Sequence, residues 1–246
     1  MYTRELRVMP SDVSCTGTIK LRSLLNYFQD TAGLAAEDFE GTTTELIARG
    51  YAWVLMRYEI DFPGRLPALD EAFRITTFHD PKHGYNTLRC FKVDALDGRH
   101  IADAKTSWLL LDIKAGRPVK PIAHIPGITS RDNEDISPDF REIPEPQGEI
   151  ARSVEFPVMF HDLDYNAHVN NAAYFEWVCD SSPVDLMTHE LGSVYASFRS
   201  GARLGEKVTL NFSQSGDNTT TCRVTREGVK KPAADFLCVW RIKEEG

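Results

Sequence analysis

The chain has 246 residues, of which 42% are hydrophobic and 26% charged, and a formal net charge of −8. These values are typical of one large or two small globular domains, and they exclude disordered and collagen-like chains. The acidic balance argues against general nucleic-acid binding, which needs a basic surface. There is no apolar stretch of about 18 residues and no apolar signal segment, so we expect no transmembrane helix and a cytoplasmic protein.

Cysteine usage points to the same compartment. The five cysteines contain no CxxC pair and their number is odd. That pattern predicts free, mostly buried thiols in a reducing environment, and no zinc site. These residues are Cys15, Cys90, Cys179, Cys222 and Cys238.

The first part of the chain predicts helices followed by a sheet. Residues 4–9 are typical of a short strand, and residues 42–49 of a short helix capped by Thr42 to Thr44. A longer helix over 19–37 carries one apolar stripe at helical spacing, made by Leu21, Leu24, Leu25 and Phe28. Four segments rich in β-branched and aromatic residues then predict an antiparallel sheet: Tyr51–Phe62, Glu71–His79, Thr87–Ala95 and Ala104–Ile113.

A proline-rich segment separates this part from the rest of the chain. Residues 114–148 contain six prolines among charged residues and few large apolar ones. This composition predicts a linker that runs extended over the surface. Beyond it we expect a helix from about Val169 to about Met187, with Pro183 as an irregularity. The strands expected around that helix are Val154–Met159, Tyr195–Ser200, Lys207–Ser213, Thr219–Thr225 and Phe236–Ile242.

The second part repeats the first at an offset of 150 residues. Five positions are identical at this offset: Glu5 and Glu155, Val8 and Val158, Met9 and Met159, Asp12 and Asp162, Asp30 and Asp180. The order of strand, loop, helix and antiparallel strands also matches, which favours a duplicated domain. We therefore expect two α+β halves, residues 1–113 and 149–246, each with one long helix packed on a sheet, and the halves joined edge to edge.

One polar loop stands out directly before the second long helix. Residues 161–171 contain Asp164, Asn166 and His168, spaced by two, so that in an extended loop all three side chains point the same way. A capped helix start needs one such side chain, and we assign that structural role to Asp162. At the same offset the first half has Ser14, Thr16 and Thr18, which can cap but cannot donate or accept a proton as an acid and base. This difference predicts one active site, in the second half.

Residues 162–177, Asp-Leu-Asp-Tyr-Asn-Ala-His-Val-Asn-Asn-Ala-Ala-Tyr-Phe-Glu-Trp, resemble the signature of the acyl-acyl-carrier-protein thioesterases. Residues 50–57 and 107–112 are similar to strand motifs of the same family. The resemblance implies a tandem (double) hot-dog fold and hydrolysis of fatty acyl thioesters, without a metal or organic cofactor. It also implies that Asp164, Asn166 and His168 are catalytic, supported by Trp177 and Asp180.

The chain departs from the family pattern at one place. The family has a Glu, and plant members also a Cys, after a Tyr/Phe-Arg pair, whereas here Phe198-Arg199-Ser200 continues into Gly201 and Ala202. A cysteine nucleophile is therefore excluded at that place. Whether Glu176 or Glu206 replaces the missing Glu is left open.

Thioester hydrolysis would then rest mainly on the polar loop. Asp164 is the candidate base or nucleophilic carboxylate, and Asn166 and His168 would orient the water or the thioester carbonyl. Backbone N–H groups at the start of the following helix would stabilise the oxyanion. The first half would supply scaffold and acyl pocket through Leu24, Phe28, Trp53 and Leu55, for each of which plain core packing is the simpler interpretation.

The implied partner is an acyl carrier protein that carries a fatty acyl chain. Because such carriers are acidic, docking requires local positive charge, for which Arg199, Arg203, Lys230 and Lys231 are candidates. Three alternatives stay open: an acyl-CoA thioesterase of the same fold, a hydratase, and a non-catalytic fatty-acyl-binding module. The sequence leaves open the acyl chain length and whether the protein is a monomer or a homodimer.

Overall fold

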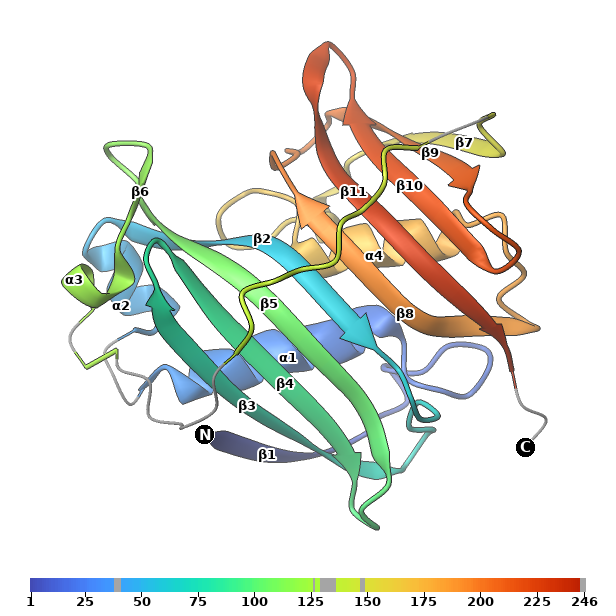
Figure 1. Cartoon of the computed structure of the whole chain (residues 1–246), viewed down its shortest axis with the longest axis horizontal. Coiled ribbons are helices and arrows are strands. Elements are labelled where there is room, and N and C mark those ends of the chain that lie inside the picture. The colour runs from blue at the N-terminus through green and yellow to red at the C-terminus, as the bar shows by residue number, and fades with distance from the viewer. Residues whose placement is uncertain (38–40, 126, 129–135, 147–148, 244–246) are drawn as a thin grey trace. The chain divides into compact units, whose positions relative to one another are not determined.

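The computed structural model describes residues 1–37, 41–125, 127–128, 136–146 and 149–243 (Figure 1). The chain divides into two compact units, which we call unit 1 (Met1–Phe140) and unit 2 (Arg141–Gly246). Each unit packs a helix against an antiparallel sheet, as the sequence predicts. The division falls inside the segment 114–148 that was expected to be a linker.

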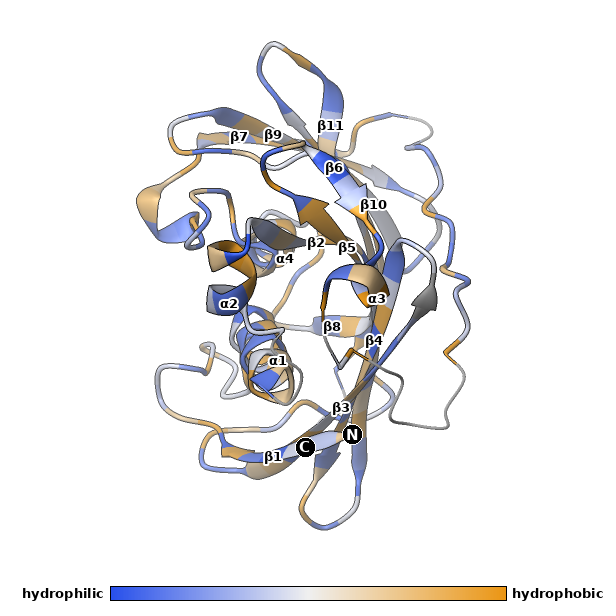
Figure 2. Ribbon diagram, turned by 90° about the vertical axis from the view of Figure 1, so that its left-hand side faces the viewer, coloured by the Kyte–Doolittle hydropathy of each residue, from blue (hydrophilic) through white to orange (hydrophobic). Residues whose placement is uncertain are grey.

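Unit 1 contains a five-stranded antiparallel sheet in the order β1-β3-β4-β5-β2, with the short β6 paired to β5. Its elements are β1 (Tyr2–Arg7), α1 (Leu21–Ala35), α2 (Thr43–Ala48), β2 (Tyr51–Asp61), β3 (Ala72–His83), β4 (Asn86–Ala95), β5 (His100–Asp112), β6 (Arg117–Val119) and α3 (Pro121–His124). In the view of Figure 2, α1 lies on one side of this sheet.

The expected apolar stripe holds α1 on the sheet. Leu24, Leu25 and Phe28 are fully buried, and the Phe28 ring stacks on Phe91 of β4 with 4.7 Å between ring centroids. Because strand side chains alternate between faces, this contact identifies the face of β4 that meets α1. The short helix α2 begins at Thr42 with the expected cap, since Thr42 and Glu45 form a reciprocal capping box.

Unit 2 repeats this plan with the strand order β8-β11-β10-β9-β7. Its elements are β7 (Arg152–Pro157), the short 3-10 helix Phe160–Asp162, α4 (Asn171–Asp180), β8 (His189–Phe198), β9 (Lys207–Gln214), β10 (Thr219–Arg226) and β11 (Val229–Ile242). The Phe175 ring of α4 meets Phe236 of β11 edge to face, with 5.1 Å between centroids, so α4 packs on its sheet as α1 does.

Three boundaries differ from the sequence prediction by about six residues or more. The second long helix ends at Asp180 rather than Met187, because Pro183 disfavours helical backbone before it and Ser181 takes the C-cap position. Strands β8 and β11 begin about six residues earlier than predicted. The early part of β11 contains polar residues such as Lys230 and Lys231, which face solvent. Composition alone therefore does not indicate a strand there.

The predicted linker is partly wrong. Strand β6 and helix α3 form within it, and Ile125 and Ile128 are buried against Leu46 and Leu110. Residues 136–146 have no regular secondary structure, as expected. In unit 1 Ile136 packs against Phe78 and Leu88. In unit 2 Arg223 forms an ion pair with Glu145, and the Arg141 guanidinium lies 4.9 Å from the centre of the Tyr195 ring. The segment is therefore tied down on each side.

The five cysteines are free thiols, as predicted, but only Cys222 and Cys238 are fully buried. Cys90 and Cys179 are half-buried and Cys15 is exposed. None of the helices in the described part of the chain combines the length and hydropathy needed to cross a membrane.

Candidate active site

The polar loop between β7 and α4 is a tight turn closed by its own backbone. The Asp164 N–H donates to the His168 carbonyl at 2.8 Å, and the Ala167 N–H donates back to the Asp164 carbonyl at 3.1 Å. Ala167 has a φ of 57°, which is uncommon for a residue with a side chain and is typical of tight turns. Leu163 and Val169 form a bridge that closes the base of the turn. The loop therefore holds positions 164 to 168 in one fixed arrangement.

The two carboxylate oxygens of Asp164 have different surroundings. Oδ1 accepts the backbone N–H of Asn166 at 2.8 Å and that of His168 at 3.3 Å. Among the described residues no donor is bonded to Oδ2. One oxygen thus fixes the turn and the other is free for chemistry, so the capping and catalytic interpretations are compatible.

The equivalent loop of unit 1 has the same backbone arrangement. The Ser14 N–H donates to the Thr18 carbonyl at 3.0 Å, and Gly17 takes the positive φ of Ala167, at 78°. Here the hydroxyls form a chain, with 2.7 Å from Ser14 Oγ to Thr16 Oγ1 and 3.1 Å from there to Thr18 Oγ1. Side chains spaced by two in this turn therefore lie on one side. The shared backbone predicts that Asp164, Asn166 and His168 also point to one side, although in the described part of the chain no hydrogen bond joins their side chains to one another.

Asp162 has the structural role that we assigned to it. It is 2% exposed, and its carboxylate accepts the Met159 N–H at 2.8 Å and the Trp177 indole N–H at 3.2 Å. In unit 1 Asp12 accepts the Met9 N–H at 2.9 Å and the Tyr27 hydroxyl at 2.7 Å. These two aspartates occupy equivalent positions of the repeat, and each forms a brace that joins its loop to the following helix. The same evidence assigns a supporting role to Trp177.

The segment after β8 lies against the His168 ring. The Val169 N–H donates to the Ala202 carbonyl at 2.9 Å, and the Ala202 N–H donates to the Tyr174 hydroxyl at 3.0 Å. A Cβ placed on Gly201 would lie 3.0 Å from His168 Cδ2. The position where the family has a Glu is therefore in direct contact with the imidazole. Sequence reasoning missed Tyr174, whose only local signal is a helical position of ordinary core type.

Neither candidate replacement for the missing Glu is placed by the structure as a free carboxylate. Glu206 accepts the Arg203 N–H at 3.1 Å and pairs with Arg226 at 3.2 Å, so its carboxylate is engaged in its own turn. Arg226 also donates to the Ser200 hydroxyl at 3.0 Å. Glu176 lies half-buried on α4.

The start of α4 offers fewer free N–H groups than expected. The Asn170 side chain accepts the Ala172 N–H at 2.8 Å, and the Ala173 N–H donates to the Asn170 carbonyl at 2.9 Å. In the part of the chain that the structure describes, the Asn171 N–H is the one left without a partner in this first turn. A helix-derived oxyanion donor would therefore be Asn171.

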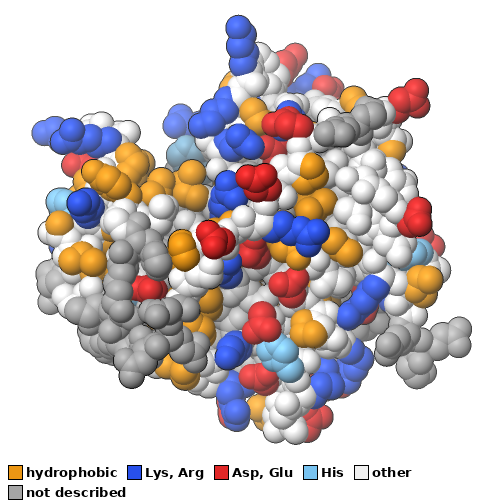
Figure 3. Space-filling view, viewed as in Figure 1, with side chains coloured by type: hydrophobic (Ala, Val, Ile, Leu, Met, Phe, Trp, Pro, Cys, Tyr) orange, Lys and Arg blue, Asp and Glu red, His pale blue; other side chains and the backbone are white. Residues whose placement is uncertain are grey.

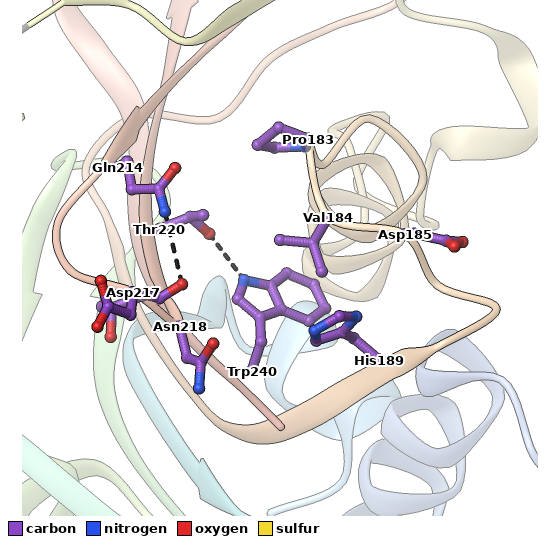
Figure 4. A pocket seen from close by; sticks show the side chains of 10 residues that line it. Pro183, Val184, Asp185, His189, Gln214, Asp217, Asn218, Thr220 and Trp240 are labelled. Atoms are coloured by element: carbon purple, nitrogen blue, oxygen red, sulfur yellow. Dashed lines mark hydrogen bonds between the residues drawn. The ribbon is translucent and has the colours of Figure 1, made fainter. Parts of the chain in front are cut away.

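A pocket of about 270 Å³ in unit 2 lies at the other end of α4 (Figure 4). Trp240 forms its base, with the indole N–H donated to Thr220 at 2.9 Å, and Pro183 to Asp185 and His189 form one wall. Because α4 has 10 residues, the pocket and the polar loop are separated by about 15 Å of helix. It is therefore distinct from the loop that carries Asp164.

The residues expected to line an acyl pocket in the first half are mainly core residues. Leu24, Phe28 and Leu55 are at most 3% exposed, and Trp53 is half-buried against the cluster of Leu46 and Leu110. Among the described residues no three His, Cys, Asp or Glu side chains gather in a way that could hold a metal ion.

Family models locate both units. The model described as acyl-ACP thioesterase N-terminal domain matches residues 1–124, and the model described as acyl-ACP thioesterase C-terminal domain matches residues 147–234. The chain belongs to the acyl-ACP thioesterase family. A chloroplastic acyl-[acyl-carrier-protein] hydrolase of Cuphea viscosissima is 25% identical over 219 residues, covering 81% of this chain and 52% of its own length. An oleoyl-acyl carrier protein thioesterase of Arabidopsis thaliana is 23% identical, covering all of this chain and 73% of its own.

Solved structures of the family confirm the fold. An acyl-ACP thioesterase from Bacteroides thetaiotaomicron superposes with a TM-score of 0.82 at 20% identity, covering 97% of each chain. The 12:0-ACP thioesterase of Umbellularia californica gives 0.79 at 17% identity, covering 98% of this chain and 97% of its own. The expected α+β double hot-dog fold is therefore confirmed. The chain spans about half the length of the curated relatives it matches first.

The contact between Gly201 and His168 leads to a first prediction for this family member. Gly201→Ala should displace the imidazole by a few tenths of an ångström, because the new Cβ would lie 3.0 Å from Cδ2. We expect kcat to fall about tenfold with little change in the melting temperature, since catalytic groups lose efficiency on small displacements. The control is Gly192→Ala, whose Cβ has 3.6 Å to its nearest neighbour. Unchanged turnover in Gly201→Ala would show that the ring position does not matter.

Proposed function

We propose that this chain hydrolyses the thioester of fatty acyl-acyl carrier protein to free fatty acid and carrier protein, and so ends fatty acid synthesis. The observation that carries the proposal is the Asp164 carboxylate, which keeps Oδ2 free in a turn whose counterpart in unit 1 has only hydroxyls. Membership of the acyl-ACP thioesterase family supports the choice of substrate.

The chemistry assigned to each group follows from its place in the loop. Asp164 Oδ2 acts either as the base that takes a proton from water or as the nucleophile that attacks the thioester carbonyl. Asn166 and His168, on the same side of the turn, orient the water or the carbonyl. The Asn171 N–H at the positive end of α4 is the candidate donor to the oxyanion. With Gly201 in place of the family Glu, no second carboxylate is assigned.

Release of free thiol from a panel of thioesters tests this function. Saturated acyl chains of graded length are presented on acyl carrier protein and, separately, on CoA. Faster turnover of the carrier-bound series supports the proposal and reveals the preferred chain length. Equal or faster turnover of the CoA series would favour an acyl-CoA thioesterase. Because a saturated chain cannot be hydrated, thiol release also separates hydrolysis from hydratase activity.

A non-catalytic fatty-acyl-binding module is the second candidate, and the absence of the Glu at Gly201 favours it. In that case acyl-acyl carrier protein binds without thiol release, and Asp164→Asn leaves binding unchanged. Hydrolysis that depends on Asp164 excludes this candidate. We place the protein in the cytoplasm, in keeping with five free thiols, and its state as a monomer or homodimer is measured in the same preparation by light scattering.

Docking of an acidic carrier protein would use the tip of the β10–β11 hairpin. Lys230 and Lys231 are exposed there, and Figure 3 shows Lys and Arg side chains gathered over this hairpin. Arg199 is less suited, since it is paired with Asp235 at 2.8 Å. Arg203 is exposed but lies in the turn beside the polar loop.

We expect the double variant Lys230→Glu, Lys231→Glu to raise KM for acyl-acyl carrier protein about tenfold, because reversed charge slows association with an acidic partner. Turnover of an uncharged acyl-pantetheine thioester should be unchanged. Salt should raise KM in the wild-type protein and have a weaker effect in the variant. Equal KM values for the two proteins would remove this hairpin from docking.

A further inference from the structure

The interior of unit 1 contains a buried arginine without a carboxylate partner. Arg89 of β4 is 9% exposed, and its guanidinium donates to the Thr77 hydroxyl at 3.2 Å. Among the described residues this is the one hydrogen bond of its five donors. Burial lowers the pKa of Arg89 to about 10, so the side chain still carries its charge at neutral pH.

Arg89 points to the face of the sheet that α1 covers. It lies two residues before Phe91, whose ring stacks on Phe28 of α1, and side chains two apart on a strand share a face. Register places it in a row across four strands, which we call the polar row. Its members, all at most 9% exposed, are His79, Arg89, Thr106 and Tyr58.

A polar group beside Arg89 has no hydrogen-bond partner among the described residues. Thr87, two residues earlier on β4 and on the same face, is 4% exposed, and its hydroxyl has no hydrogen-bond partner among the described residues. The nearby carboxylates Asp80, Asp94 and Asp103 of these strands are on the other face by alternation. A buried charge without a carboxylate partner and a buried hydroxyl without a hydrogen bond are both costly, so each calls for an explanation.

The fold itself does not require this row. The ends of the paired strands are equivalent, since the Ile113 N–H donates to the Gly50 carbonyl in unit 1 and the Lys243 N–H to the Thr188 carbonyl in unit 2. Residues at the same distance from these ends are equivalent, so Phe236 corresponds to Thr106 and Ala196 to Tyr58. The equivalent row of unit 2 is apolar and buried, and its members are Phe212, Cys222, Phe236 and Ala196. Arg89 thus stands where the same architecture accepts Cys222.

The buried side chains of α1 become smaller along the helix. Along α1 the large buried residues Leu24, Leu25 and Phe28 are followed by Thr31, the last buried position of the helix, and then by Ala32 and Ala35. The Tyr27 ring packs on Phe73 and the Phe28 ring packs on Phe91, so α1 runs toward the polar row. The side chains that this stripe of α1 carries beyond Phe28 are therefore smaller than those before it.

We propose that unit 1 binds an alkyl carboxylate in its interior, with the carboxylate on the Arg89 guanidinium and the Thr87 hydroxyl. A carboxylate matches a guanidinium in both charge and geometry, and it would neutralise the charge that the described residues leave without a carboxylate partner. The apolar part of the ligand would lie along α1. A free fatty acid has this chemistry.

Thermal unfolding of the wild-type protein with octanoate, octanedioate and octanol tests the site directly. The carboxylates should raise the melting temperature, because a ligand that binds only the folded state stabilises it, and octanol should not. In Arg89→Met we expect carboxylate affinity about 10- to 100-fold weaker, as for the loss of charged hydrogen bonds. Lys92→Met, exposed on the same strand, removes one charge as a control and should bind as the wild type does.

Stability without ligand separates this site from a structural arginine. Arg89→Met should unfold at the same or a higher temperature than the wild type, because it removes a buried charge. Thr87→Val should fold equally well and bind carboxylate several-fold more weakly. Absence of binding in the wild type, equal binding by Arg89→Met, or loss of folding in both variants would overturn the proposal.

Discussion

Asp164→Asn is expected to lower thiol release from acyl-acyl carrier protein by about 10²–10⁴-fold, the usual contribution of a positioned acid–base group. Folding should be unchanged, because the amide oxygen can still accept the Asn166 and His168 N–H groups that Oδ1 accepts now. Only the charge and the free oxygen Oδ2 are lost. Steady-state kinetics and the melting temperature of the purified variant measure the two effects separately.

Unit 1 provides the matched control for this substitution. Ser14 has the equivalent place and accepts the Thr16 N–H at 3.2 Å, so Ser14→Ala disturbs the twin loop without touching Asp164. We expect Ser14→Ala to keep wild-type turnover. Asp164→Ser, which places the residue of unit 1 in unit 2, should fold and be inactive. Near-wild-type turnover in Asp164→Asn would remove Asp164 from the mechanism.

Asp162→Ala is expected to have the largest effect on stability. The change leaves the Met159 N–H and the Trp177 indole N–H without their acceptor inside the fold. Losing hydrogen bonds to a buried carboxylate should lower the free energy of unfolding by about 3 kcal/mol. For a chain of this size that corresponds to a fall in melting temperature of about 6–12 °C. Activity should fall as well, because the brace positions the turn that carries Asp164.

Asp12→Ala separates the effect on stability from the effect on activity. Asp12 braces the loop of unit 1 through Met9 and Tyr27, and it is half-buried where Asp162 is fully buried. We expect a smaller loss of stability and unchanged kcat below the melting temperature. If Asp162→Ala unfolds at the wild-type temperature, the carboxylate is not a brace and the role that we assign to it is wrong.

The family resemblance and the local patterns anticipated much of this site. The duplication, the apolar stripe of α1 and the contrast between Ser14 and Asp164 are all visible along the chain. The resemblance also pointed to Gly201 as a departure, but not to its contact with His168. That contact joins a loop before α4 to a segment after β8, and nothing in either local pattern reports the distance between them.

Arg89 is an instructive intermediate case. The alternation of Thr87, Arg89, Phe91 and Val93 already placed a charge on the same face as two large apolar residues, yet a strand pattern alone does not say which face is covered. Only the stacking of Phe91 on Phe28 identifies that face as the interior. The linker prediction was partly wrong for a related reason. Ile125 and Ile128 are too few to form a periodic pattern, and they are buried only because Leu46 and Leu110 are beside them.

The sequence by itself determined the features set by neighbouring residues: helices from apolar spacing, the Thr42 cap, strands from their β-branched and aromatic residues, and two copies from a constant offset. These depend on interactions within a few positions, which a linear pattern contains. The tertiary structure alone decided which Asp164 oxygen is free, that Glu206 is engaged by Arg226, and that Arg89 is buried without a carboxylate. Each of these depends on strand register and on packing between residues far apart in the chain, where one hydrogen bond or one covered face decides the chemistry.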